Sequence, residues 1–386
     1  MTCHANFFLM EKMHSARRLE FVDSLRAIAA LAVTCYHLPL IALGHPLALP
    51  KELLTFLQAV GGSGVDLFFA LSAFLLCMLM PSYERNPRPT LSFYLKRFFR
   101  IAPLFYLALV YWITARYLQG TSPDWRKVLY AITFTFNLNP SAADGEVFAG
   151  WTVGVEMLFY AIFPFLFRAL PGWKLKVAAL LLSMPLYPLA LAVFGYLPFD
   201  DKVLQRYQLL TIFKHLPVFL LGLVAFEAYE RLRTQKDAFG ISAILVAGAI
   251  ALLGNVIAGR AFFSGDTRTL GWALLIVGAG LYRWPFINPV MAFLGRISYS
   301  IYLLHGPIII SMGGVFLAIY GWGAPTLLSF LMCVALALAV IVPISWLSFV
   351  LIETPGNRLG SYLVTKLRAQ FRTIEPVSAG AANVAS

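Results

Sequence analysis

The sequence predicts an all-α membrane protein, a polytopic bundle of about ten transmembrane helices with both termini in the cytoplasm. Two features of its composition indicate this class: 60% of its 386 residues are hydrophobic, and only 12% are charged. Soluble domains carry about 25% charged residues, so this chain has too little polar surface to cover a soluble globule. The composition therefore excludes a soluble enzyme, a disordered chain and a nucleic-acid-binding domain, although the net charge is +12.

Ten apolar runs approach the length of about 20 residues that crosses a hydrocarbon core about 30 Å thick. In chain order they cover residues 24–43, 61–81, 102–119, 149–169, 175–195, 208–229, 239–258, 269–284, 297–320 and 325–352. The eighth run is the weakest of them. The segment 128–140 is apolar but too short to span, and we expect it to be interfacial or re-entrant.

The distribution of Lys and Arg predicts the orientation. With the N-terminus in the cytoplasm, 20 of the 30 Lys and Arg residues fall in segments on the cytoplasmic side, and 8 fall in outer loops. Cytoplasmic loops carry the excess of positive charge, so this bias favours two cytoplasmic termini. We expect tails at 1–18 and 359–386 around one membrane domain at 19–358, and the first tail lacks the continuous apolar region of a signal peptide.

Several ionisable residues lie inside the apolar runs. Charged groups at bilayer depth are costly unless paired or hydrated, so each is a candidate functional residue. Counting about 1.5 Å per residue from the predicted span ends places one group of them at a similar level in the outer half of the membrane. They are His37, Asp66, Glu156 and the pair Lys214 and His215. A shared level favours a common site; alternatively, some of these groups pair to hold helices together.

Arg26 and His37 form a sharper pattern. They lie eleven residues apart in the first run, which is about 20° more than three helical turns and about 16 Å along the axis. Arg26, near the cytoplasmic boundary, suits a phosphate group, and His37, deeper in the membrane, can exchange a proton near neutral pH. This spacing suits a long molecule with a phosphorylated head and a reactive end, such as acyl-coenzyme A. Arg26 alone would be equally consistent with a snorkelling anchor.

Two further clusters have both a functional and a structural interpretation. Arg97 and Arg100 lie beside aromatic residues in the run FYLKRFFRIAP, where they would bind either such a phosphorylated ligand or lipid headgroups. Ser298, Tyr302 and His305 form a polar stripe on an apolar helix, which would serve either the site or helix packing. The four cysteines form no CxxC pair or Cys/His cluster, so we expect neither a disulfide framework nor a metal site.

Six motifs occur in order from about residue 19 to 358. They are FVDSLRAIAALAVTCYH, GGSGVDLFFALSAFLL, RFFRIAPLFY, WTVGVEMLFY, LGRISYSIYLLH and ETPGNR. This ordered set resembles acyltransferase family 3, a family of integral membrane acyltransferases. The matching positions include Asp23, Arg26, His37, Trp151, Thr152, Glu156, His305, Glu353 and Pro355. The chain departs from the family pattern at Ala27 and Ala73, where the family usually has glycine, which affects helix packing more than chemistry.

The resemblance implies an O-acyltransferase that moves an acyl group, most often acetyl, from cytoplasmic acyl-coenzyme A to a hydroxyl group. The acceptor is usually a glycan or glycolipid that is extracytoplasmic or membrane-bound. The implied partners are acyl-coenzyme A as donor substrate, the acceptor and membrane lipids, with no permanently bound cofactor and no nucleic acid. The implied location is the bacterial inner membrane.

The expected site residues follow from the motifs and the buried charges together. His37 would act as general base or acyl carrier, with Glu156 orienting or stabilising its imidazole. Arg26, Arg97 and Arg100 would bind the donor. The supporting polar residues would be Asp23, Asp66, Ser72, Trp151, Tyr302 and His305.

Two other functions compete with this hypothesis. A transporter could export a sugar or small acid along the same polar residues, but the inverted repeats that would favour it are not evident in the sequence. A structural partner in a polysaccharide assembly complex would not need the buried charges.

Overall fold

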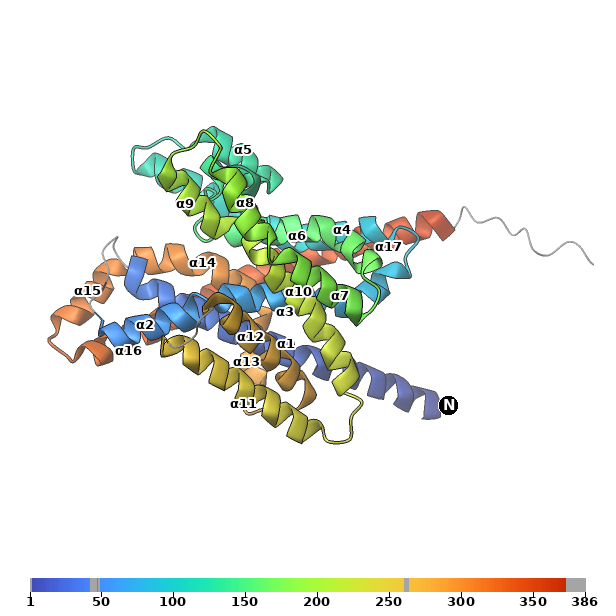
Figure 1. Cartoon of the computed structure of the whole chain (residues 1–386). Helices are drawn as coiled ribbons and strands as arrows, with labels where there is room; N and C mark the ends of the chain where they lie inside the picture. The colour runs from blue at the N-terminus through green and yellow to red at the C-terminus, as the bar shows by residue number, and fades with distance from the viewer. Residues whose placement is uncertain (1, 42–46, 48, 260–263, 373–386) are drawn as a thin grey trace, which may run out of the picture.

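Helices make up 83% of the chain in the computed structural model, which describes residues 2–41, 47, 49–259 and 264–372. No strand occurs among these residues. The predicted all-α membrane bundle is therefore confirmed. Figure 1 shows that α1 begins and α17 ends on the same side of the bundle.

The helices follow one another with short connections. Their bounds are α1 Thr2–Ile41, α2 Lys51–Gly61, α3 Gly64–Glu84, α4 Pro89–Leu118, α5 Trp125–Thr133, α6 Trp151–Ala169, α7 Trp173–Ser183, α8 Leu186–Phe194, α9 Asp201–Leu210, α10 Ile212–Leu232, α11 Ala238–Ile257, α12 Ser264–Leu281, α13 Pro289–Arg296, α14 Ser298–Ser311, α15 Gly313–Gly321, α16 Thr326–Ser348 and α17 Thr354–Arg372. Short 3₁₀ turns at Phe136–Leu138 and Pro140–Ala142 precede α6, and a π-helical turn at Phe349–Glu353 joins α16 to α17.

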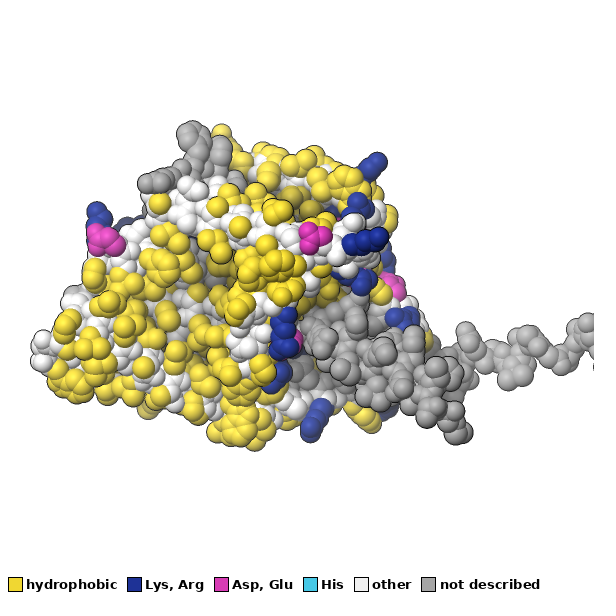
Figure 2. All heavy atoms as spheres, turned by 90° about the horizontal axis from the view of Figure 1, so that it is seen from below, with side chains coloured by type: hydrophobic (Ala, Val, Ile, Leu, Met, Phe, Trp, Pro, Cys, Tyr) yellow, Lys and Arg dark blue, Asp and Glu magenta, His cyan; other side chains and the backbone are white. Residues whose placement is uncertain are grey.

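Eight helical stretches in the described part of the chain are long and apolar enough to cross a membrane. They correspond to eight of the ten predicted runs. The bent pair α13–α14, with 69° between its axes, would make a ninth span, and the weak eighth run is the shorter apolar helix Thr267–Leu281. On the face seen in Figure 2, hydrophobic side chains cover most of the surface, and most visible Lys and Arg lie towards the right of the view.

The helix α1 packs against α3, α13 and α14. Gly295 allows the close approach of α13, because a side chain there would collide with the backbone of Asp23. The two alanines that replace family glycines, Ala27 and Ala73, are fully buried. A Cβ on Gly222 of α10 would lie 2.9 Å from the Cβ of Ala73, so Gly222 makes room for the extra methyl group.

The segment between α5 and α6 folds into the bundle. Phe136 and Asn137 are fully buried, and Asn137 Nδ2 donates a hydrogen bond to the Leu210 carbonyl at 3.2 Å. The first turn of α6 is consequently buried too, with Thr152 only 6% exposed. The helix α6 therefore starts among buried residues of the bundle.

Candidate active site

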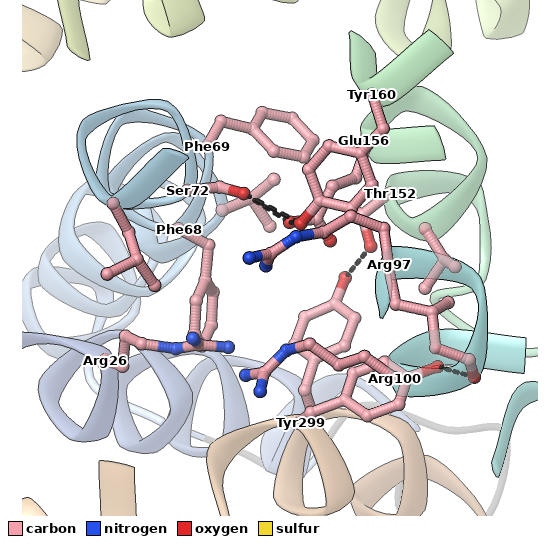
Figure 3. Close-up of a pocket in the computed structure, with 15 residues that line it drawn as sticks. Arg26, Phe68, Phe69, Ser72, Arg97, Arg100, Thr152, Glu156, Tyr160 and Tyr299 are labelled. Atoms are coloured by element: carbon pink, nitrogen blue, oxygen red, sulfur yellow. Dashed lines mark hydrogen bonds between the residues drawn. The ribbon is translucent and has the colours of Figure 1, made fainter. Parts of the chain in front are cut away.

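Five helices, α1, α3, α4, α6 and α14, enclose a cavity of about 60 Å³ at the centre of the bundle (Figure 3). We call it the arginine cavity. Its polar lining residues are Arg26, Ser72, Arg97, Arg100, Thr152, Glu156, Tyr160, Tyr299 and Tyr302. The three predicted donor-binding arginines thus line one cavity, together with Ser72, Glu156 and Tyr302 from the predicted site.

The carboxylate of Glu156 is held by two hydroxyl groups. Ser72 Oγ donates to Glu156 Oε1 at 2.6 Å, and Tyr160 Oη donates to the same oxygen at 2.5 Å. The two hydroxyl oxygens lie 3.0 Å apart. Hydrogen bonds from two neutral donors stabilise a carboxylate, so Glu156 is fixed on the wall of the arginine cavity.

The guanidinium groups of Arg26, Arg97 and Arg100 point towards the same space (Figure 3). The Nε atoms of Arg26 and Arg97 are buried, and neither has a hydrogen-bond partner in the described residues. Among the residues that line the cavity, three guanidinium groups face the one carboxylate of Glu156. Asp23 and Glu353, outside the lining, interact electrostatically with Arg26 and Arg100. The arginines on the cavity wall suit an anionic ligand group.

His37 pairs with His305 from α14. His37 Nδ1 lies 3.1 Å from His305 Nε2, and His305 Nδ1 lies 2.5 Å from the Tyr302 carbonyl oxygen. A carbonyl oxygen only accepts, so the network assigns the hydrogen of neutral His305 to Nδ1 and makes its Nε2 an acceptor. His37 Nδ1 then donates to His305, and the His37 ring also has a hydrogen bond to the Val33 backbone. Because Nδ1 carries the hydrogen, the lone pair of neutral His37 is on Nε2. This is the tautomer that a general base needs.

His37 lines a second cavity, of about 290 Å³, which we call the histidine cavity. It is lined by His37, Trp112, Arg116, Asp144, Gly145, Glu146, Val147, Phe148, Ala149, Trp151 and Arg206. The cavity lies between the last turns of α1 and α4, the segment before α6, and α9. Its ion pairs join Arg116 to Glu146 and Arg206 to Asp144.

A thin wall separates the two cavities. Tyr302 and Thr152 line the arginine cavity and Ala149 lines the histidine cavity. Tyr302 Oη lies 2.9 Å from Thr152 Oγ1 and donates to the Ala149 carbonyl at 3.2 Å. Ala149 has a φ of 57°, a left-handed conformation that residues other than glycine rarely adopt. The boundary between the cavities is therefore formed by three hydrogen-bonding groups, one of which belongs to the strained residue Ala149.

Asp66, a predicted site residue that lines neither cavity, forms a separate cluster with Arg268 and His215. Asp66 Oδ2 accepts from Arg268 at 3.1 Å, and Asp66 Oδ1 lies 3.8 Å from His215 Nδ1. The ring of His215 packs 5.3 Å from that of Trp151, which lines the histidine cavity. Asp66 and His215 are thus placed to support Trp151.

The sequence predicts a similar level for one group of ionisable residues: His37, Asp66, Glu156, Lys214 and His215. In the structure these residues lie in three different local environments. The hydrogen-bond partners of His37 and Glu156 differ: His37 pairs with His305, and Glu156 accepts from Ser72 and Tyr160. Glu156 shares a cavity with Arg26, whereas His37 lines the other cavity.

Sequence reasoning missed Tyr160 and the role of Glu353. Tyr160 lies four residues after Glu156 on the same helix face, a spacing that could have signalled the contact. Glu353 is 1% exposed, accepts from Ser300 at 2.5 Å and interacts electrostatically with Arg100 and Arg26. Its π-helical turn has no signal in the sequence. In the described residues, no group of three or more His, Cys, Asp and Glu side chains could hold a metal ion.

The fold and these cavities define an integral membrane protein whose buried histidine lies beside a cluster of arginines. A family model described as an acyltransferase domain matches residues 19–346, and the chain belongs to this family, acyltransferase family 3. It is therefore a membrane acyltransferase of the O-acyltransferase type.

Curated relatives carry names consistent with this family. The chain is 31% identical to the exopolysaccharide production protein ExoZ of Rhizobium meliloti, over 69% of this chain and 82% of the relative. It is 25% identical to the peptidoglycan O-acetyltransferase OatA of Listeria monocytogenes, over 77% of this chain and 50% of the relative. The chain thus spans about half the length of that second relative. No solved structure matches the chain.

Proposed function

We propose that the protein transfers an acyl group, acetyl in the first instance, from cytoplasmic acyl-coenzyme A to a hydroxyl group of a glycan outside the cytoplasm or at the membrane. The observation that carries this proposal is the arginine cavity, which lies behind one thin wall from His37. We place the protein in a bacterial inner membrane with both termini in the cytoplasm. The positive charge of its predicted cytoplasmic segments supports that orientation.

The donor would enter with its anionic groups towards Arg26, Arg97 and Arg100. Guanidinium groups bind phosphate oxygens bidentately, and two of these side chains have buried Nε atoms without hydrogen-bond partners among the residues that the structure describes. We expect one anionic group of the donor to enter the cavity, which has a volume of about 60 Å³. Acyl-coenzyme A acts here as a substrate consumed at each turnover.

His37 would remove the proton of the acceptor hydroxyl through its Nε2. As the hydroxyl oxygen forms a bond to the acyl carbon, the bond from that carbon to sulfur breaks, and coenzyme A leaves as a thiolate. The proton held by His37 returns to this thiolate, so the products are an ester and free coenzyme A. In the alternative route, His37 Nε2 is itself acylated first, coenzyme A leaves, and the acceptor then attacks the acyl-imidazole.

The names of the two relatives support a glycan as acceptor. One is named for exopolysaccharide production and the other for O-acetylation of peptidoglycan. Both names concern carbohydrate polymers found outside the cytoplasm. A glycan hydroxyl is accordingly the acceptor group that we propose for this chain.

Purified protein with radiolabelled acetyl-coenzyme A and a panel of bacterial glycans tests this proposal. We expect label to move to a glycan as a base-labile ester, with one free coenzyme A released per ester. His37→Ala should lower the rate by about 10²–10⁴-fold. Full activity in His37→Ala, or label transfer that does not need a glycan hydroxyl, would contradict the proposal.

A further inference from the structure

The histidine cavity differs in chemistry from the arginine cavity. It is about 290 Å³ in volume, and His37, three aromatic side chains and two ion pairs line it. Small-molecule sites typically combine aromatic walls with a few placed polar groups, in cavities of roughly 300–1,000 Å³. Its lining is therefore that of a binding site for a small part of a larger ligand.

Two buried polar groups on its lining residues lack hydrogen-bond partners within the described ranges. The side chain of Glu146 is 1% exposed, and neither carboxylate oxygen accepts a hydrogen bond, although Arg116 Nε lies 2.9 Å from Oε2. The indole N–H of Trp112 is also buried without an acceptor. Since buried polar groups are nearly always hydrogen-bonded, a ligand that both donates and accepts would satisfy them.

The charges around the cavity compensate one another. Arg116 lies beside Glu146, and Arg206 Nε lies 2.6 Å from Asp144 Oδ1. Each of the two cations that line the cavity thus has a carboxylate partner. A phosphate or carboxylate ligand would have to displace one of these partners, whereas a neutral ligand with hydroxyl groups leaves both ion pairs intact.

Phe148 fixes the position of His37 at this cavity. Its ring lies 5.3 Å from the His37 ring and 5.6 Å from the His305 ring, edge to face with both. A side chain at Gly306 would occupy the place of the Phe148 ring, so the glycine allows this packing. The Phe148 ring therefore packs against both imidazoles of the histidine pair.

We propose that the histidine cavity binds the acceptor, and that the group it binds is a neutral sugar residue of a glycan. One sugar hydroxyl donates to His37 Nε2, a second donates to Glu146, and a sugar oxygen accepts from the indole N–H of Trp112. This inference rests on the proposed function, because it identifies the acceptor site of the same reaction.

Binding measurements on the full chain in detergent separate the two proposals. Calorimetric titration with acetyl-coenzyme A reports the donor site. Titration with two oligosaccharide sets of equal length, one of neutral hexoses and one containing uronic acid, reports the acceptor site. The variants are Glu146→Gln and Trp112→Ala, and the matched control is Glu230→Gln, whose ion pair with Arg233 lines none of the cavities described above.

We expect a neutral oligosaccharide to bind the parent protein, and Glu146→Gln and Trp112→Ala each to weaken that binding by at least about tenfold. Glu146→Gln replaces a charged acceptor with a weaker neutral one, and Trp112→Ala removes a buried ligand contact. Acetyl-coenzyme A should bind both variants as it binds the control. Neutral-sugar binding that both variants preserve, preference for the uronic acid set, or no neutral-sugar binding to the parent would each overturn the inference. Failure of acetyl-coenzyme A to bind the parent would instead contradict the proposed function. Equal loss of both ligands in Glu146→Gln alone would indicate misfolding, and Trp112→Ala then decides.

Discussion

His37 Nδ1 lies 3.1 Å from His305 Nε2, although the two residues are separated by 268 positions in the chain. The Tyr302 carbonyl accepts a hydrogen bond from the other nitrogen of His305, Nδ1. The two hydrogen bonds therefore run in one direction, from His37 to His305 to Tyr302. In the proposed mechanism His305 would act on the reaction through His37, as a positioning residue. In a serine protease the aspartate has the corresponding task of fixing a tautomer.

Replacing His305 tests this relationship. His305→Phe keeps a ring in place but removes the acceptor for His37 Nδ1, so we expect kcat to fall at least about tenfold while KM for acetyl-coenzyme A is unchanged. His305→Asn, whose amide oxygen can accept, should retain more activity than the Phe variant. Steady-state kinetics of both variants measures this. Equal kcat in the parent and the Phe variant would show that the pair is only a packing contact.

Arg26 can be examined by a change that conserves its charge. Arg26→Lys loses the bidentate fork, so acetyl-coenzyme A should bind at least about tenfold more weakly, with acceptor binding little changed. Arg233→Lys is the control, because Arg233 pairs with Glu230 and lines neither cavity. If Arg26→Ala binds acetyl-coenzyme A as tightly as the parent protein, Arg26 is a topological anchor.

Glu156→Gln distinguishes two roles for this carboxylate. The amide oxygen can still accept from Ser72 and Tyr160, so the wall of the arginine cavity should persist. Loss of the negative charge should strengthen binding of the anionic donor a few-fold, or roughly 1 kcal/mol, by an amount that shrinks with added salt. Calorimetry at two salt concentrations measures it. Unchanged donor affinity together with an altered pH profile of kcat would instead favour action on the imidazole.

The membrane class and eight of the spans could be predicted from the sequence, because a long apolar run is a local property of the chain. The importance of buried charge could be predicted for the same reason. The grouping of Glu156 with Arg26 could not, since it depends on how α1, α3, α4, α6 and α14 pack around one cavity, which no local pattern encodes.

The histidine cavity shows the same limit. Arg116 falls near the end of the predicted run 102–119, and Glu146 lies just before the predicted run 149–169. In the structure Glu146 is buried beneath Arg116, because the segment before α6 folds against the end of α4. Pairing across such distances in the chain requires the tertiary fold.

The orientation of the bundle is open to direct measurement. Reporter fusions near residues 90, 234 and 370 should report the cytoplasm, and fusions near 125 and 202 the outside, because the excess of Lys and Arg lies in the first group of segments. Enzymatic reporters active on only one side of the membrane give the comparison. Reversal at any two of these positions would contradict a donor site that opens to the cytoplasm.

The order of bond formation at His37 is the remaining question for the chemistry. Direct transfer needs both substrates together, so without acceptor the protein should release coenzyme A only slowly. An acyl-histidine route predicts a burst of coenzyme A, at most one per protein molecule, before any acceptor is added. The Nε2 of His37 faces this choice in either case. Because His305 accepts from His37 Nδ1, an imidazole acylated at Nε2 would still keep that hydrogen bond.

Rapid-quench measurement of coenzyme A with excess acetyl-coenzyme A distinguishes the routes. His37→Gln should abolish a burst and lower the steady rate by about 10²–10⁴-fold. Full activity in that variant would exclude both routes, since neither the base nor the acyl carrier would then be present.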